Sequence, residues 1–259
     1  METVVVDDGA TIAWTRTGTL RGPTLLLSNS IGTNLSMWDP QMAVLGERFC
    51  VLRYDTRGHG CSEAPAGPYT LERLARDAAA VLDAADAARA HVCGLSLGGV
   101  IAQRLAVDRP ERIDRLVLAN TAARIGTREG WQARIDTIAA GGLEAISEMA
   151  MQRFFGEAFR SRNPEIVDRF RTMLVANSPI GYAGCCHALR DADLTSALSR
   201  ITASALVIGG TDDVSTPAAQ AEALSVAIPG ARVVLLNAAH MSSVERPDDF
   251  NRALLDFLQ

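Results

Sequence analysis

The chain has 259 residues, 48% of them hydrophobic and 21% charged, which predicts one large globular domain and excludes a disordered chain or two enzymes in tandem. The formal net charge is −5, all 25 basic residues are arginines and they form no basic run, so a nucleic-acid-binding protein is excluded. The sequence contains neither a signal peptide nor an apolar stretch of about 18 residues, and we expect a cytoplasmic protein that does not contact membranes.

Short apolar runs along the chain predict the strands. They cover residues 4–6, 11–15, 25–27, 50–54, 91–94, 116–118, 205–208 and 233–236. The first two runs are joined by the turn residues Asp7, Asp8 and Gly9, which predicts a hairpin. The later runs do not alternate with polar residues, which is typical of strands buried on both faces of a parallel sheet.

Helical periodicity appears between these runs. Apolar residues in 71–81 share one face behind Thr70, a predicted N-cap, and residues 250–258 show the same pattern behind Pro247. Since strands and helices alternate, we predict an α/β fold with a mostly parallel central sheet flanked by helices.

One long segment, residues 122–198, interrupts this alternation. It contains helical patterns and no clear strand, which predicts a helical cap inserted between two strands of one core. The predicted cap helices cover residues 131–140, 143–155 and 164–176, and the core is expected to comprise residues 1–121 and 199–259.

The cysteines predict neither disulfides nor a metal site. They are odd in number and lack the paired spacing of a zinc site or a disulfide framework. We expect reduced and mostly buried thiols at Cys50, Cys61, Cys93, Cys185 and Cys186.

The segment AHVCGLSLGG, residues 90–99, has the pattern of a nucleophile elbow. A buried strand runs into Gly94, Ser96 and Gly98, and a helical pattern follows at residues 100–107. Ser96 must occupy a sharp turn, in which side chains two positions before or after it would collide with neighbouring backbone. We therefore predict Ser96 as a nucleophile and the Leu97 N–H as an oxyanion donor.

A serine nucleophile requires a general base, and His240 is the predicted one. It follows the last strand pattern, so it should reach the same carboxyl edge of the sheet as Ser96. His59, His91 and His187 are expected to have structural roles, although His59 also has a position from which it can line the pocket.

An orienting acid should follow a strand and precede the histidine along the chain. The loop GTDDVSTP supplies two candidates after residues 205–208. We predict Asp213, because it fits the GxxDxxxP pattern of such loops, and keep Asp212 as the alternative.

Six phrases spread over nearly the whole chain resemble the 3-oxoadipate enol-lactone hydrolases, α/β-hydrolases of aromatic-acid catabolism. They are SNSIGTNLSMWDPQ (28–41), RYDTRGHGCSEAPAGPYTLE (53–72), CGLSLGG (93–99), LANTAARIGT (118–127), GYAGCC (181–186) and AAHMSSVERP (238–247). The resemblance implies the α/β-hydrolase fold, a Ser96, Asp213 and His240 triad, and a small lactone or ester as substrate. It also implies that the Ile31 N–H is the second oxyanion donor and that no metal or organic cofactor is needed.

The chain departs from these relatives at two places. Leu97 stands where they usually have methionine, and the acid loop reads GTDD where they usually read GTxD or GTHD. Neither change removes a catalytic group, but both are expected to touch the pocket.

The substrate of this family carries a free carboxylate, which an enclosed pocket must pair with a cation or N–H donors. Arg124 and Arg134, near Trp131 in the predicted cap, are the candidates. Aromatic residues are expected to line the apolar part of the pocket and to exclude water. They are Trp38, Trp131, Phe154, Phe155 and Tyr182.

Other functions remain open at this stage. A general carboxylesterase or a cofactor-free perhydrolase of the haloperoxidase kind would have the same triad and core, and GYAGCC favours the lactonase over both. A non-catalytic ligand receptor built on a hydrolase scaffold is the alternative from a different class. The sequence does not distinguish a monomer from a homodimer.

Overall fold

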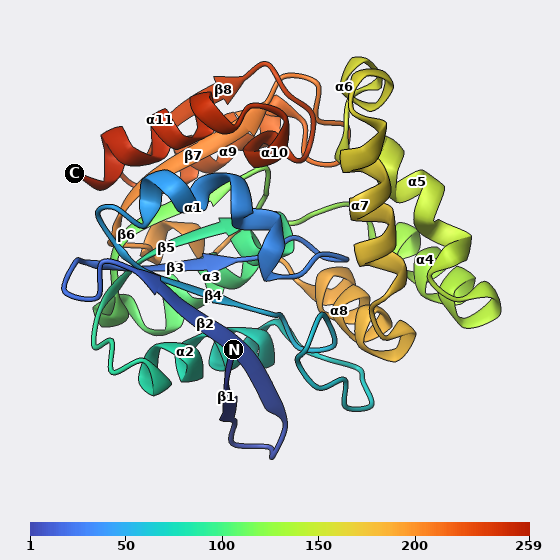
Figure 1. The fold of residues 1–259 in the computed structure, drawn as a ribbon, viewed down its shortest axis with the longest axis horizontal. Coiled ribbons are helices and arrows are strands. Elements are labelled where there is room, and N and C mark those ends of the chain that lie inside the picture. The colour runs from blue at the N-terminus through green and yellow to red at the C-terminus, as the bar shows by residue number, and fades with distance from the viewer.

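The computed structural model describes residues 1–259 and is built around one eight-stranded sheet (Figure 1). Its strands are β1 (Glu2–Val5), β2 (Thr11–Gly18), β3 (Thr24–Ser28), β4 (Cys50–Tyr54), β5 (Ala90–Leu95), β6 (Ile113–Ala119), β7 (Ser204–Gly210) and β8 (Arg232–Leu236). The spatial order is β1-β2-β4-β3-β5-β6-β7-β8. β2 is antiparallel to both β1 and β4, and the other neighbours are parallel. Each predicted run overlaps one strand, so the predicted hairpin and the mostly parallel sheet are confirmed.

Helices alternate with the strands after β3. They are α1 (Asp39–Leu45), α2 (Leu71–Ala84), α3 (Leu97–Asp108), α4 (Arg128–Gly141), α5 (Glu144–Phe154), α6 (Glu157–Arg162), α7 (Pro164–Val175), α8 (Pro179–Asp191), α9 (Ala218–Ala227), α10 (Ser242–Glu245) and α11 (Pro247–Leu258). The two predicted helix starts are confirmed. Thr70 caps α2 by accepting a hydrogen bond from the Arg73 N–H, and Pro247 begins α11.

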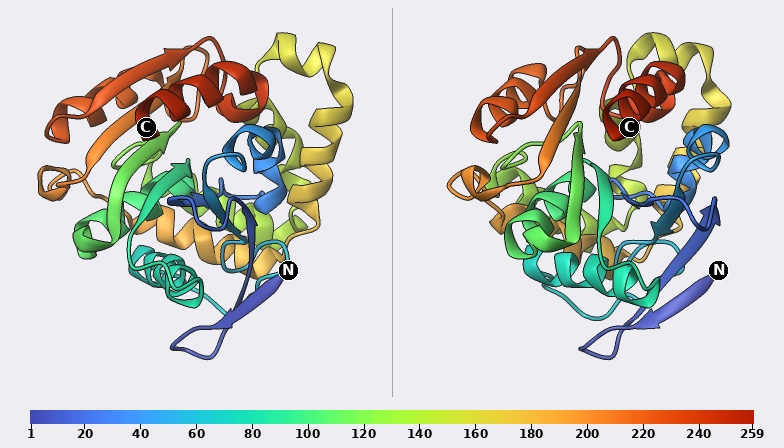
Figure 2. Two further views of the ribbon diagram at one scale, coloured as in Figure 1. Left: turned by 60° about the vertical axis from the view of Figure 1, so that its left-hand side comes forward. Right: turned by 90° about the vertical axis from the view of Figure 1, so that its left-hand side faces the viewer.

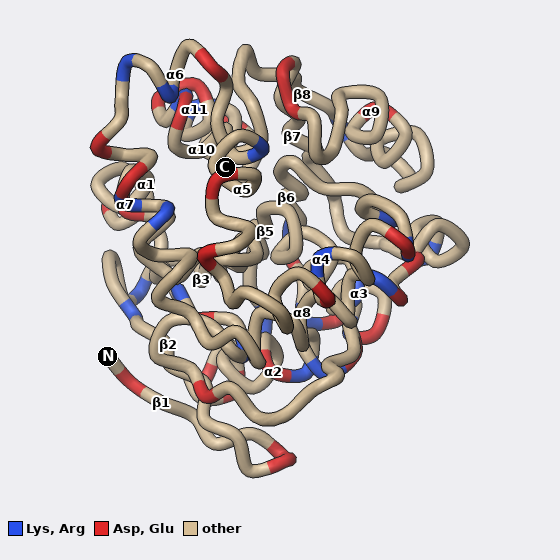
Figure 3. The backbone as a smooth tube through the Cα atoms, turned by 90° about the vertical axis from the view of Figure 1, so that its right-hand side faces the viewer, with Lys and Arg blue, Asp and Glu red and all other residues tan.

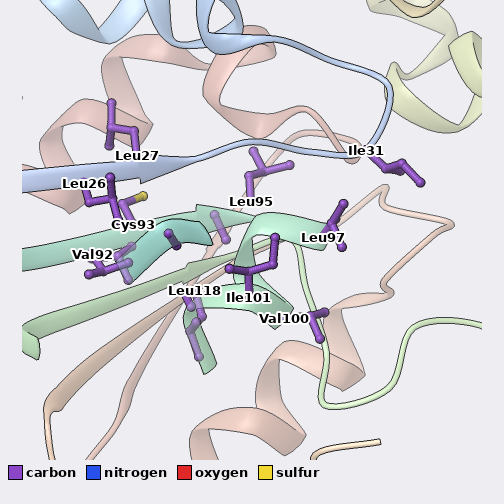
Figure 4. Close-up of a cluster of buried hydrophobic side chains, with 14 of the residues drawn as sticks. Leu26, Leu27, Ile31, Val92, Cys93, Leu95, Leu97, Val100, Ile101 and Leu118 are labelled. Carbon is purple, nitrogen blue, oxygen red and sulfur yellow. The ribbon is translucent and has the colours of Figure 1, made fainter. Parts of the chain in front are cut away.

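Two layers of helices cover the sheet. α1 and α11 pack together on one face, and α2 and α3 pack together on the other, where α9 lies against β7 (Figures 1 and 2). Fully buried side chains of β3, β5 and β6 meet those of α3, including Leu26, Val92, Leu118 and Ile101 (Figure 4). Each such side chain contributes about 1.5–3 kcal/mol by leaving water. The core thus lies directly beneath the turn that precedes α3.

The segment between β6 and β7 contains the helices α4 to α8, which gather at one end of the sheet (Figure 1). Three of them overlap the predicted cap helices, whereas the sequence analysis missed α6 and α8. For α8 a signal was present, because Ser178 accepts a hydrogen bond from the Gly181 N–H and Pro179 takes the first position of the helix. The cap boundaries at residues 122 and 198 stay a prediction.

Charged residues of both signs are scattered over the helices and loops rather than gathered in one patch (Figure 3). No helix combines the length and the hydrophobicity that crossing a bilayer requires. All five cysteines are free thiols and only Cys61 is exposed, as the sequence predicts.

Candidate active site

Ser96 lies at the turn where β5 ends and α3 begins. Its backbone has φ 57° and ψ −115°, in a left-handed region that residues other than glycine rarely adopt. Two hydrogen bonds hold this conformation. The Ser96 N–H donates to the Ala119 carbonyl at 3.0 Å, and the Thr121 hydroxyl donates to the Ser96 carbonyl at 2.8 Å. The end of the neighbouring strand β6 and the loop that follows it therefore support the strained turn.

The glycines around Ser96 permit close contacts between backbone segments. A Cβ atom on Gly94 would lie 2.1 Å from the Gly98 carbonyl oxygen, and one on Gly98 would lie 2.1 Å from the Ser28 carbonyl oxygen. Both distances are far below a van der Waals contact, so no side chain fits at either position without moving the backbone. The structure confirms the steric reason that the sequence analysis gave for these two glycines.

Asp213 and His240 form a buried pair beside this turn. Asp213 lies in the loop after β7, and its Oδ2 is 2.8 Å from Nδ1 of His240. Although burial alone would raise the pKa of the Asp213 carboxyl, the His240 charge and the hydrogen bonds from His240 and Thr216 lower it to about 2. The alternative acid, Asp212, is exposed and makes its only side-chain hydrogen bond with Thr211. Of the two carboxylates, Asp213 is the one that reaches the imidazole.

Other groups fix the Asp213 carboxylate in place. Oδ1 accepts the N–H groups of Ser215 and Thr216, at 2.8 and 2.9 Å. Oδ2 also accepts the Thr216 hydroxyl at 2.7 Å and the Asn120 side-chain amide at 3.0 Å. Asn120 was not predicted from the sequence, although a polar residue directly after a buried strand such as β6 is a usable signal. Its amide also donates to the carbonyl of Ala239, the residue before His240.

Ser96 and His240 both line one cavity of about 470 Å³ between the core and helices α4 and α5. Because Asp213 occupies Nδ1 of the imidazole, Nε2 is the nitrogen left for this cavity. The Ser96 hydroxyl makes no hydrogen bond with His240 in the structure. In free enzymes such bonds are often long and form only with substrate. No group of three or more His, Cys, Asp or Glu side chains is placed to hold a metal ion.

Two backbone N–H groups are available next to Ser96. Ile31 lines the cavity from the loop after β3, and its N–H makes no hydrogen bond with the protein. Leu97 is the first residue of α3, where an N–H has no intrahelical partner. The Leu97 side chain is fully buried in the hydrophobic core and is not part of the cavity lining, contrary to the expectation that it touches the pocket.

His59 supports the loop that carries Ile31. Its Nε2 accepts the Gly32 N–H at 3.0 Å, and its Nδ1 lies 3.2 Å from the Arg57 carbonyl oxygen. His59, His91 and His187 all lie outside the cavity lining, so the alternative in which His59 lines the pocket is wrong.

Acidification is expected to weaken folding through His59. Burial lowers the pKa of this imidazole from 6.5 to about 4, so its neutral form is the one that the fold stabilises. The stabilisation of the fold by neutral His59 should be fully present above pH 6.5 and be lost as the pH falls toward 4. The reason is that protonated Nε2 cannot accept the Gly32 N–H. We expect a loss of about 3 kcal/mol in the free energy of unfolding, measured with urea at several pH values. His59→Gln should flatten this profile, and an identical profile for both proteins would contradict the assignment.

The predicted substrate-binding residues divide into two groups. Trp131, Arg134 and Phe154 line the cavity. The Arg134 guanidinium lies 4.8 Å from the centroid of the Trp131 ring, and the Phe154 ring stacks beside that of His240 at 6.2 Å. One aromatic ring of the cavity lining thus lies beside the cation and another beside the imidazole.

The other predicted residues lie outside the cavity lining, which corrects the expectation for them. Trp38 is fully buried, and its indole N–H donates to the Asn29 side chain at 2.9 Å. Tyr182 is buried against His59. Arg124 is half-exposed and faces Asp193 at 3.7 Å. Phe155, next to Phe154, is fully buried and packs on other cap aromatics.

Arg153 lines the cavity although the sequence analysis did not select it. It lies seven residues after Ile146 and three after Ala150, which also line the cavity, so α5 spacing was a usable signal. Arg134 donates to the Tyr182 hydroxyl at 3.4 Å, and no acidic side chain forms an ion pair with Arg134 or Arg153. Two positive charges therefore face this cavity without a counter-ion from the protein.

Known proteins with related sequences and structures share this architecture. The family model described as alpha/beta hydrolase fold matches residues 23–247. The chain is 43% identical over 232 residues to 3-oxoadipate enol-lactonase 2 of Acinetobacter baylyi, covering 90% of this chain and 87% of that protein. The enol-lactonase structure from Burkholderia xenovorans LB400 has 43% identity and a TM-score of 0.97, covering 99% of both chains. A hydrolase structure from Pseudomonas aeruginosa has 45% identity and a TM-score of 0.97, covering 99% of this chain and 97% of that one.

Proposed function

This chain belongs to the alpha/beta hydrolase family and, within it, to the enol-lactonases, and we propose that its own substrate is 3-oxoadipate enol-lactone. It is a hydrolase of ester bonds. The observation that carries the proposal is a cavity with Ser96 and His240 at one part of its lining and two unpaired arginines at another. Such a cavity fits an ester substrate that also carries a carboxylate. With this substrate the product would be 3-oxoadipate, and the proposed role is a step of aromatic-acid catabolism.

In the first step, Ser96 Oγ attacks the lactone carbonyl carbon while His240 Nε2 accepts the hydroxyl proton. The Ile31 and Leu97 N–H groups donate to the oxyanion of the tetrahedral intermediate. The bond between the carbonyl carbon and the ring oxygen then breaks, and the leaving enol oxygen takes the proton from His240. The enol becomes the ketone, and the other end of the opened ring stays attached to Ser96 as an ester.

In the second step, water hydrolyses this acyl-enzyme. His240 takes a proton from the water as its oxygen attacks the ester carbon, and returns the proton to Ser96 Oγ when the intermediate collapses. The Asp213 carboxylate keeps Nδ1 protonated and stabilises the imidazolium formed in both steps. The cycle consumes one water molecule and leaves the enzyme unchanged.

Arg134 and Arg153 are the residues that we propose for the substrate carboxylate. Contacts with Trp131 and Tyr182 already restrict the Arg134 side chain. It therefore loses less conformational entropy when its guanidinium binds the substrate carboxylate. Hydrogen bonds between a guanidinium and a carboxylate are charge-assisted and contribute about 1.5–3 kcal/mol each. The pair therefore favours a carboxylated lactone over a neutral one.

Alanine at Arg134 or Arg153 is expected to raise the KM for 3-oxoadipate enol-lactone by about 10- to 100-fold, because a charge-assisted hydrogen bond is lost. The same variants should hydrolyse α-angelica lactone, which has the same ring and no carboxylate, about as well as the unmodified enzyme. Arg124→Ala is the matched control, since this cap arginine lies outside the cavity lining. Initial rates with both lactones measure the effect.

Two outcomes would overturn the proposal. If both variants keep the unmodified KM for the carboxylated lactone, the arginines do not bind its carboxylate. If the unmodified protein prefers neutral p-nitrophenyl esters to the carboxylated lactone, a general carboxylesterase replaces the lactonase. A chain that a fluorophosphonate probe fails to label would instead be a receptor without serine chemistry.

A further inference from the structure

We propose that Glu245 is a positioning residue that couples the cap to the loop carrying His240. Glu245 ends the short helix α10, five residues after His240. Its Oε1 accepts the N–H of Gly156 at 2.7 Å, and its Oε2 accepts the N–H of Ala239 at 3.1 Å. One donor lies between the cap helices α5 and α6, and the other immediately precedes the histidine.

Further contacts join the end of α5 to the histidine loop at and after His240. The Met241 N–H donates to the Phe154 carbonyl at 2.9 Å. The rings of Phe154 and His240 are nearly parallel, with 24° between their planes. The residues before and after His240 are thus both hydrogen-bonded, directly or through Glu245, to the end of α5.

The peptide groups around Ala239 are held from two sides. Its N–H donates to Glu245, and its carbonyl accepts the Asn120 amide at 3.2 Å. Since Asn120 also binds Asp213, one set of hydrogen bonds connects the acid, the histidine loop and the cap. A displacement of Ala239 would move the imidazole relative to both Asp213 and Ser96.

The two hydrogen bonds at position 245 require a carboxylate rather than an amide. Two N–H donors face the two oxygens of Glu245, and a glutamine would offer one oxygen and turn its NH₂ group toward the second donor. Partial burial, together with Asp212 and Asp213 nearby, raises the pKa of Glu245, and the two N–H groups act in the opposite direction. Glu245→Gln therefore removes one acceptor and the charge while keeping the size of the side chain.

This coupling has a consequence for catalysis that rests on the proposed function. Arg153 and Phe154 are the last residues of the cavity lining on α5, directly before the segment that Glu245 binds. Holding this segment on the histidine loop sets the position of the carboxylate-binding side of the cavity relative to His240. Glu245 then affects the reacting geometry without touching the substrate.

Glu245→Gln is expected to lower kcat for the enol-lactone by about 10- to 100-fold while KM changes less than threefold, because small displacements of the base have effects of this size. The rate of fluorophosphonate labelling at Ser96 should fall by a similar factor. Labelling needs no lactone, so it tests the coupling even where the proposed substrate fails. Glu63→Gln is the matched control, because Glu63 accepts the Thr11 N–H at 2.7 Å away from the cavity and should keep the unmodified labelling rate.

A second variant tests the cap side. Gly156 has φ −63°, which proline adopts, the preceding Phe155 is extended, and the atoms nearest to an added Cβ are 3.9 Å away. Gly156→Pro removes the N–H donor and places its ring Cδ where Oε1 of Glu245 now accepts, so it should slow labelling as Glu245→Gln does. Gly156→Ala keeps the donor and should slow labelling less. The labelling rate of the double variant Glu245→Gln with Gly156→Pro should be at least about half that of the slower single variant, because both changes remove the same contact. A labelling rate and a kcat within twofold of the unmodified protein for Glu245→Gln, or fully additive losses in the double variant, would overturn the proposal.

Discussion

Replacing Ser96 by alanine is expected to reduce turnover of the enol-lactone by roughly four to six orders of magnitude. The loss is large because no other hydroxyl is held on the strained turn above β5, and because water alone must then attack the carbonyl. The cavity, the cap arginines and the two free N–H groups stay in place, so binding of the product should change little. Steady-state rates measure the first effect and calorimetric titration with 3-oxoadipate measures the second.

The control for this variant is chemical. A fluorophosphonate should modify the unmodified protein once per chain and leave Ser96→Ala unmodified, which intact-mass spectrometry detects. Retention of more than a few per cent of the lactonase rate, or labelling of the alanine variant at another residue, would reject Ser96 as the nucleophile.

Replacing Asp213 by asparagine is expected to lower kcat by roughly 10⁴-fold, because the amide favours the wrong tautomer of His240. Asp212→Asn is the matched control. The two carboxylates are adjacent in sequence, but only Asp213 lies 2.8 Å from the imidazole, and Asp212 is exposed. The control should therefore retain nearly the full rate. A large loss in Asp212→Asn with a small loss in Asp213→Asn would reverse the assignment.

The dependence of the rate on pH tests whether Asp213 stays ionised during catalysis. Because the pKa of Asp213 is lowered to about 2, its carboxylate stays charged throughout the range in which the protein is assayed. Protonation of Asp213 therefore cannot cause a decrease in kcat/KM between about pH 7 and 5. Comparing the activity profile with the unfolding profile shows whether such a decrease follows the loss of structure at His59.

The strands and the residues of the proposed triad were predictable because their signals are local. An apolar run without alternation identifies a strand buried on both faces, and Gly94, Ser96 and Gly98 occur directly between such a strand and a helix. In a parallel sheet, residues that follow strands reach one edge, so Asp213 and His240 could be selected from their order along the chain. These inferences needed no knowledge of how the side chains are directed.

The lining of the cavity was harder to predict because it depends on the direction of individual side chains. Trp38 looked suitable for an apolar pocket, but its indole N–H finds a buried partner in Asn29, and this contact directs the ring into the core. Arg124 and Arg134 have the same chemistry, yet only the second lies on the cap face toward Ser96. Sequence spacing within one helix was more informative, and it would have identified Arg153 on α5.

Asn120 and Glu245 escaped prediction for a further reason. Each donates hydrogen bonds to, or accepts them from, segments far away in the chain, for example 119 residues apart for Asn120 and Ala239. No spacing rule relates such partners, because their meeting depends on where the cap rests on the core. The position of Asn120 after β6 was a usable signal, but the partners of both residues become visible only when the hydrogen bonds of the Ala239 backbone are followed in three dimensions.

The close main-chain contacts at the turn around Ser96 also bear on how such an enzyme can be altered. The carbonyl oxygens of Ser28 and Gly98, rather than neighbouring side chains, define the space in which this turn fits. Evolution can therefore exchange the residues facing the bound lactone while the hydroxyl remains where it is. A library intended to change substrate preference is best directed at α4 and α5, and the three residues from Ser96 to Gly98 are best left untouched.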